Sequence, residues 1–280
     1  MKTKSLGTKS DGSTPLETIT YDYNIRGWLL GANRAFLSPS VNASPGSSNW
    51  FGFELGYDKV NHGGGAGFWG PNQYNGNIKG QLWRSVDDGV QRAYHYYYDA
   101  ANRLLTAYYD QRNAGGNWDI SEMDFTFWTD HSGNGSSGPP YDHNGNLLQM
   151  GHRGFKPGAN TMGERNIDIL IYEYHPNSNR LKRVVDHVST PQNLGDFTDK
   201  STALEDYGYD YNGNLVTDLN KRLNGSVGSN QNTGGAISYN HLNLPATIAV
   251  KKDDGSPKGT ISYTYDAAGN KLRKTTVETG

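Results

Sequence analysis

Acidic and amide side chains recur beside glycine in this chain, in the segments DHNGN (142–146) and DYNGN (210–214). Oxygen-rich segments of this kind resemble calcium loops. Those loops place ligands at the first, third and fifth positions, glycine at the sixth and a bidentate Glu at the twelfth. Here glycine is fourth, and the twelfth positions hold Arg153 and Lys221. The spacing therefore argues against a calcium loop, and we expect no metal site.

Other catalytic patterns are equally incomplete. Gly65, Gly67 and Gly70 spell G-x-G-x-x-G, but they follow no apolar strand, and Pro71-Asn72 comes next instead of a helix, so no dinucleotide site is predicted. The sequence contains no cysteine, no H-E-x-x-H and no G-x-S-x-G, which removes the common thiol, zinc-protease and serine-hydrolase chemistries. We expect a protein that is not an enzyme and binds no cofactor.

Three carboxylates, Glu54, Glu122 and Asp124, are the candidates for a glycosidase pair, whose activity depends on the distance between two acidic groups. No motif joins them, and we disfavour this interpretation. For the recurring aspartates, we favour an Asx-type hydrogen bond from the carboxylate to turn amides over a metal-binding or catalytic role. Glycine in the same turns allows positive φ. The expected turn residues are Asp22, Asp99, Asp142, Gly145, Asp210, Gly213, Asp266 and Gly269.

The elements that would position these turns are short strands. In the segment 206–223, Tyr207, Tyr209 and Tyr211 alternate, so a strand would point all three to one face. Asn212-Gly213 then predicts a two-residue type I′ turn, and Leu215 begins the return strand. The unit is a β-hairpin.

This hairpin frame recurs along the chain. From Tyr141 onward the copies begin 33, 35, 30 and 26 residues apart, a spacing typical of repeat architectures. The copies are YDYNIRGWL at Tyr21, YNGNI at Tyr74, YDAANRL at Tyr98, YDHNGNL at Tyr141, YHPNSNRL at Tyr174, YDYNGNL at Tyr209, YNHLNLP at Tyr239 and YDAAGNKL at Tyr265.

Composition favours an all-β fold. With 36 Gly, 19 Tyr and 34% hydrophobic residues, the chain suits short strands and tight turns better than helices. Residues 1–15 read as a flexible lead-in, and residues 16–280 as one repeat domain with an irregular Gly/Trp-rich insertion at about 32–83. A strand is also expected over 124–128. A net charge of −2 with mixed signs predicts no nucleic-acid partner, and no segment is apolar enough for a membrane span.

The tyrosine rows allow two interpretations. Cross-strand aromatic pairs stabilise a sheet, whereas exposed tyrosines could form a platform on which sugars stack. We favour packing, because the tyrosines belong to the repeat frame itself. Tyr94, Tyr96 and Tyr98 are expected on one face, with His95 and Tyr97 on the other.

Taken together, the tandem YDxxGNL units resemble the RHS/YD-repeat family from Tyr21 to Val277, and the phrases QYNGNIKGQLW and YDAAGNKL resemble RHS proteins of Bacteroidetes-type bacteria. The resemblance implies a long antiparallel sheet that spirals into a hollow shell around a C-terminal cargo, often a toxin. The core segment of the family, rich in Asp, Pro and Gly-Arg-Phe, has no match here, so no catalytic residue is carried over.

These observations lead to an expected function as a structural shell segment that contains or displays a cargo, secreted or at the cell surface of a bacterium. The alternative is a surface module that binds glycans or proteins through exposed aromatics. The expected partners are the remainder of a longer RHS polypeptide or its cargo, and self-association through sheet edges near 18–23 and 261–274 is also expected.

Overall fold

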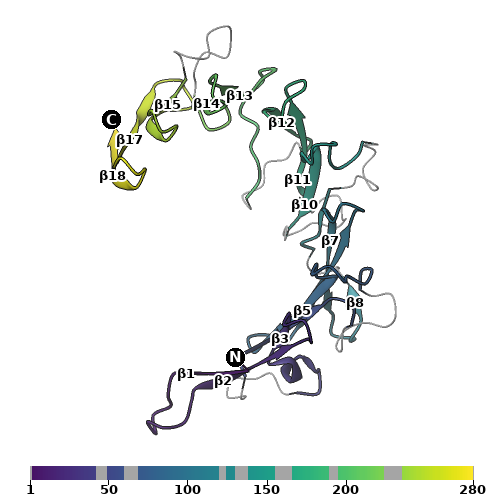
Figure 1. The fold of residues 1–280 in the computed structure, drawn as a ribbon. Helices are drawn as coiled ribbons and strands as arrows, with labels where there is room; N and C mark the ends of the chain where they lie inside the picture. The colour runs from purple at the N-terminus through teal and green to yellow at the C-terminus, as the bar shows by residue number, and fades with distance from the viewer. Residues whose placement is uncertain are drawn as a thin grey trace. The chain divides into compact units, whose positions relative to one another are not determined.

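The computed structural model describes residues 2–41, 49–59, 69–119, 124–129, 138–154, 166–188, 195–223 and 235–279. This part of the chain is all-β, with 18 mostly antiparallel strands and one short 3-10 helix (Figure 1). Internal contacts divide the chain into two compact units. Unit 1 comprises Met1–Pro140 and Met150–Ile167, and unit 2 comprises Tyr141–Gln149 and Asp168–Gly280. The sequence alone predicts a single domain over residues 16–280.

Unit 1 is a run of antiparallel strands in the order β1 to β7, then β9 and β10. Strands β8 and β9 both pair with β7. Its elements are β1 (Thr3–Leu6), β2 (Glu17–Tyr23), β3 (Leu29–Ala32), η1 (Arg34–Leu37), β4 (Phe51–Gly56), β5 (Gly80–Ser85), β6 (Gln91–Tyr98), β7 (Leu104–Arg112), β8 (Trp118–Asp119), β9 (Phe127–Trp128) and β10 (Gln149–Arg153).

Residues 1–15 are not only a flexible lead-in, because they contain strand β1. This strand pairs antiparallel with β2, from Thr3 opposite Thr20 to Leu6 opposite Glu17. The physical reason is the backbone of β2, whose outer edge would otherwise present unpaired N–H and C=O groups. The edge expected near 18–23 is therefore covered, and β1 forms the edge instead.

The Gly/Trp-rich stretch at about 32–83 contributes two regular strands, β4 and β5, which pair along their full lengths. Residues 60–68 of this stretch lie outside the described residues. Trp69 returns to the sheet and lies flat on Gly80, where a β-carbon would come within 1.9 Å of the indole. Glycine is required there because the ring occupies the space of a side chain.

The core of unit 1 forms on this same face. Leu37, Trp69, Leu82 and Ala93 make one buried cluster, against which the partly buried Trp118 packs. Alternate residues of β4, β5 and β6 are buried on the core side, as the twofold period of a strand requires. The strand expected over 124–128 is limited to the two residues of β9.

Unit 2 consists of hairpins that follow one another along the chain. Its strands are β11 (Asn166–Tyr174, which enters unit 2 at Asp168), β12 (Leu181–Asp186), β13 (Tyr207–Tyr209), β14 (Leu215–Asp218), β15 (Ile237–Tyr239), β16 (Pro245–Lys251), β17 (Pro257–Tyr265) and β18 (Lys271–Glu278). The pairs β11–β12 and β13–β14 are antiparallel, and β15 to β18 form a four-stranded antiparallel sheet. The segment 261–274 lies in β17 and β18, which pair with each other, so β18 is the edge. Over the described ranges, no helix is both long and apolar enough to cross a membrane.

Candidate functional site

The repeated turns are three-residue hairpin loops, not the two-residue type I′ turn predicted at Asn212-Gly213. The amide of Gly213 donates to the carbonyl of Asp210 at 3.0 Å, and the amide of Asp210 donates to the carbonyl of Asn214 at 2.9 Å. Gly213 has φ 88°, whereas Asn212 is not among the residues with positive φ. The loop is thus a type I turn followed by one left-handed residue, and the strand register shifts beside it.

The same pair of backbone bonds recurs throughout both units. In each loop, the first residue binds the carbonyl four positions later and accepts from the amide three positions later. The loops begin at Asn24, Asp99, Asn113, Asp142, Asp210, Asn240, Lys252 and Asp266. The turn of YHPNSNRL is one residue longer, because the amide of His175 donates to the carbonyl of Arg180.

Four of the five predicted aspartates bind turn amides as an Asx-type role requires. Asp142 Oδ1 accepts the amides of Asn144 and Asn146 at 2.8 Å each, and its Oδ2 accepts the side-chain amide of Asn146 at 2.7 Å. Asp99, Asp210 and Asp266 bind the corresponding amides of their own turns. The predicted glycines of these turns, Gly145, Gly213 and Gly269, all have positive φ. These residues fix the loop conformation.

Asp22 does not have this role. It lies within the β2–β3 ladder opposite Gly31, and its carboxylate is 3.4 Å from Arg34. The turn residue of this first repeat is Asn24, whose Oδ1 accepts the amides of Arg26 and Trp28 at 2.9 Å. The prediction was wrong by two residues because YDYN contains two Tyr-x pairs, and asparagine caps this loop as well as aspartate does.

The carboxylate of Asp266 is held in its ionised form. For Asp266, the side-chain amide of Asn270 and the backbone amides of Asn270 and Ala268 together lower the pKa. Hydrogen bonds donated to a carboxylate favour its charged state, because protonation would remove an acceptor. This environment explains the acidic residue without any bound ion.

Tyrosine hydroxyls connect six of the described segments to an earlier turn of the chain. In most hairpins the donor directly precedes the turn, and its hydroxyl reaches the carbonyl of the residue that leaves the previous turn, at 2.7 to 3.2 Å. The pairs are Tyr57 with Leu29, Tyr98 with Ile78, Tyr174 with Leu147, Tyr209 with Leu181, Tyr239 with Leu215, and Tyr265 with Pro245. We call this set the tyrosine ladder. It gives the repeated tyrosine a specific role that cross-strand packing alone does not provide.

Asparagine side chains make a second set of contacts between successive turns. Asn179 Oδ1 accepts the side-chain amides of Asn144 and Asn146 at 3.1 and 2.8 Å. Asn243 Oδ1 accepts those of Asn212 and Asn214 at 3.0 and 3.2 Å. Sequence reasoning missed this link, although the recurrence of Asn in the frame was its signal. Each turn in these pairs is therefore tied to its neighbour by side chains as well as by the tyrosine ladder.

The most aromatic part of unit 1 has both faces occupied. Tyr94 stacks on Trp83 at 5.7 Å and on Tyr96 at 6.0 Å, and meets Tyr109 edge to face at 5.5 Å. On the opposite face His95 is buried beside Trp69. Burial, with the neighbouring Tyr109 and Asp124, raises the pKa of Tyr94 to about 12.

The carboxylates considered for glycoside hydrolysis have structural partners. Glu54 is 1% exposed, and its Oε1 lies 2.6 Å from Arg34 Nη2. Asp124 is fully buried, accepts the amide of Thr126 and lies 3.3 Å from Arg153. Glu122 lies outside the described residues. The described pair does not meet in a common site.

Of the three glycines in the G-x-G-x-x-G segment, the described residues include only Gly70. That residue lies against the backbone of Tyr96, where an added β-carbon would be 2.3 Å from the carbonyl oxygen. Close approach between two backbone segments therefore explains its glycine.

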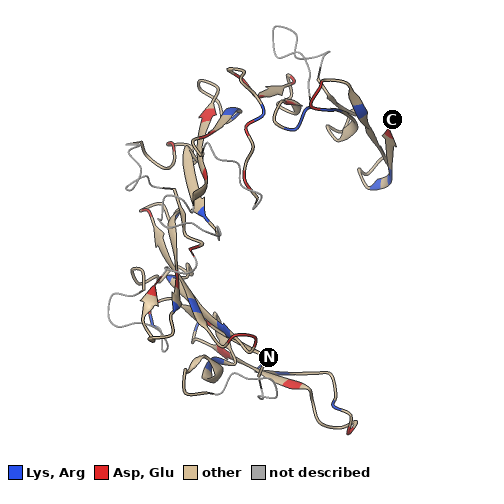
Figure 2. Ribbon diagram, turned by 180° about the vertical axis from the view of Figure 1, so that it is seen from behind, with Lys and Arg blue, Asp and Glu red and all other residues tan. Residues whose placement is uncertain are grey.

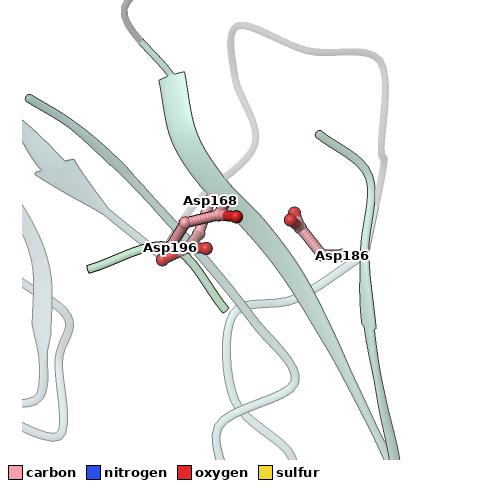
Figure 3. Close-up of side chains that lie close together, drawn as sticks. All are labelled: Asp168, Asp186 and Asp196. Carbon is pink, nitrogen blue, oxygen red and sulfur yellow. The ribbon is translucent and has the colours of Figure 1, made fainter. Parts of the chain in front are cut away.

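One cluster of acidic side chains lies in unit 2. Asp168 (β11), Asp186 (end of β12) and Asp196 each bring a carboxylate oxygen within 4.8 Å of the others, and Figure 3 shows Asp186 directed toward the other two. Asp168 Oδ1 accepts the amide of Phe197 at 2.7 Å, and Asp186 Oδ1 accepts those of Ile169 and Val188 at 3.0 Å. Backbone tethering thus accounts for two of the carboxylates, and the cluster alone identifies no ligand.

Comparison with known proteins found no matching family model and no matching curated protein. The class of protein defined by the structure is an all-β protein with a long antiparallel sheet, built from successive hairpins.

Proposed function

We propose that the chain is a non-enzymatic structural segment of an RHS-type repeat protein, whose sheet continues into a curved, spiralling shell that contains or displays an attached polypeptide. The observation that carries the proposal is the tyrosine ladder. It uses a repeated side chain to join successive copies of the repeat frame in unit 2. Such repetition builds an extensible wall, because each unit contacts only its neighbours.

The turn chemistry supports a structural role. The Asp and Asn side chains that sequence reasoning examined for catalysis or metal binding form hydrogen bonds within their own loops and to the next loop. A catalytic carboxylate needs a geometry and a pKa matched to its reaction, whereas these groups are committed to turn amides. The RHS-like motifs extend the proposal to a secreted or cell-surface bacterial protein. Its partners would be further repeats of the same polypeptide or its C-terminal cargo.

Protease protection tests containment. A reporter enzyme is fused after Gly280 in one protein, and in a second protein further repeats and an RHS-type closing segment are inserted before the same reporter. We expect added protease to digest the first reporter rapidly and to spare the second, because only a closed wall excludes a protease. Equal, rapid digestion of both reporters would contradict containment.

A second candidate function is a glycan- or protein-binding surface module. Its support is the accessible aromatic side chains at the start of β4, where Trp50 is 55% exposed and Phe51 is 45% exposed. The ring of Phe51 lies 6.1 Å from that of the half-buried Phe53, which is opposite Trp83 in the sheet. Aromatic rings with an accessible face suit stacking on sugars. A glycan array with the purified chain separates the two proposals. Specific binding that is lost in Trp50→Ala and kept in the turn variant Tyr211→Ala would favour the module.

A further inference from the structure

A basic pocket lies in unit 2, away from the tyrosine ladder. It encloses about 340 Å³ and is formed by three segments that are distant in sequence: the stretch before β13, the turn after β14 and the β16–β17 turn. The cationic residues that line it are Lys200, Lys221, Arg222, Lys251, Lys252 and Lys258. We call it the basic pocket. Figure 2 shows the Lys and Arg residues of the described ranges in blue.

Acidic groups neutralise only part of this charge. Asp253, the one carboxylate of the lining, lies 3.0 Å from Arg222 Nε and 3.6 Å from Lys200 Nζ, and Lys221 lies 3.4 Å from Asp218. The neighbouring Asp254 accepts the amide and the hydroxyl of Ser256. Three lysines of the pocket remain without any ion pair within the described part of the chain, namely Lys251, Lys252 and Lys258.

Arg222 provides an independent indication. In the described ranges, positive φ occurs at glycines, at asparagines and at Arg222, whose φ is 56°. A long side chain in this region is strained, and strain of this kind is concentrated at functional sites. The guanidinium is fixed by Asp253 and by the carbonyl of Lys200 at 3.1 Å, and the carbonyl of Arg222 accepts the amide of Lys251. The backbone therefore holds an arginine in the position where the other turns have glycine or asparagine.

We propose that the basic pocket binds a compact, multiply charged oxyanion carrying phosphate or sulfate groups. Six cationic residues and one carboxylate line the pocket, and such a local excess of positive charge favours a polyvalent anion over a single carboxylate. Arginine offers a planar fork to such oxygens, and lysines add mobile point charges. The cationic residues come from three segments that line one pocket of limited volume, so a compact ligand fits better than a long polyanion.

The test uses the whole chain and inorganic tripolyphosphate at low salt, measured by isothermal titration calorimetry. The pocket variant is Lys252→Gln with Lys258→Gln. The control is Lys182→Gln with Lys274→Gln, which removes the same charge from other positions of unit 2. We expect saturable 1:1 binding by the wild type, a loss of about tenfold or more in the pocket variant, and less than about threefold in the control. Inorganic phosphate and sulfate, titrated in parallel, distinguish the two kinds of group.

Three results would overturn the proposal: no saturable binding by the wild type, an equal loss in both variants, or tighter binding of a DNA duplex than of tripolyphosphate. An equal loss would mean that overall charge attracts the anion without a site. Amide chemical-shift changes on adding tripolyphosphate provide a second readout. They should concentrate at Arg222 and Lys252, and a uniform distribution over unit 2 would also count against the pocket.

Discussion

Removal of one hydroxyl group from the tyrosine ladder should measurably weaken the connection between two hairpins. Tyr209→Phe deletes the bond to the carbonyl of Leu181 at 2.9 Å. It keeps the ring, which lies beneath Arg180 at 5.8 Å and meets His175 edge to face at 6.3 Å. A neutral, half-buried hydrogen bond contributes about 1 kcal/mol, and a carbonyl left without a partner raises the loss toward about 2 kcal/mol.

Tyr211→Phe is the matched control. Tyr211 lies in the same turn and is 74% exposed, so its loss of a hydroxyl should change the free energy of unfolding by less than about 0.5 kcal/mol. Urea unfolding followed by far-UV circular dichroism measures the free energy of unfolding of both variants. In a thermal melt, Tyr209→Phe should lower the melting temperature by about 3 °C. If the two variants lose the same stability, the ladder hydroxyl does not couple the hairpins, and the reasoning is refuted.

The remaining predictions concern the turns, the buried tyrosines and the sheet edges. Gly213→Ala should lower the free energy of unfolding by about 1–2 kcal/mol, as measured by thermal melts. The cause would be backbone strain at positive φ and not a clash, because the nearest atom to an added β-carbon is Arg180 Nη2 at 3.5 Å. Gly213→Asn should be less destabilising, and the reverse order would contradict the left-handed turn. Asp210→Asn should lose less than Gly213→Ala, since an amide oxygen still accepts; a much larger loss would reveal another role for the carboxylate. Burial raises the pKa of Tyr94 and of Tyr172 from 10.0 to about 12. The folded chain thus retains protons that the unfolded chain releases, and stability should fall between about pH 10 and 12; urea midpoints that stay constant over this range would contradict the burial. The edges β1 and β18 should promote self-association, which light scattering at rising concentration detects, and a persistent monomer would show that these edges are protected.

The all-β class and the hairpin repeats could be predicted from sequence because their signals are local. Five consecutive residues contain the chemistry of a turn: an acceptor side chain at the first position, a glycine or asparagine at the fourth and an amide to be bound at the fifth. For Asp142, Gly145 and Asn146, all three parts were visible in DHNGN. The same local view failed at Asp22, because Asn24 provides an equally good acceptor two residues later.

Features that depend on distant residues could not be predicted. Strand β1 has the exposure pattern of a surface strand, so neither burial nor periodicity marks Thr3–Leu6 as part of a sheet. The acceptors of the tyrosine ladder are backbone carbonyls, mostly of the aliphatic residue that ends a repeat motif, and the identity of a side chain does not show which distant hydroxyl its carbonyl will meet. In the basic pocket, Lys200, Arg222 and Asp253 come from three separate segments, and only the fold brings their charges together.

The tyrosine ladder also bears on how the chain acquires its structure. Each of its bonds spans only 20 to 28 residues of sequence. Closing loops of this length costs little entropy, and the cost rises slowly with length. A new hairpin in unit 2 can therefore add to an existing one as soon as it leaves the ribosome, without waiting for distant segments. Unfolding should also proceed one hairpin at a time. Amide hydrogen-exchange rates should therefore change gradually along the repeats, instead of reporting one global unfolding event.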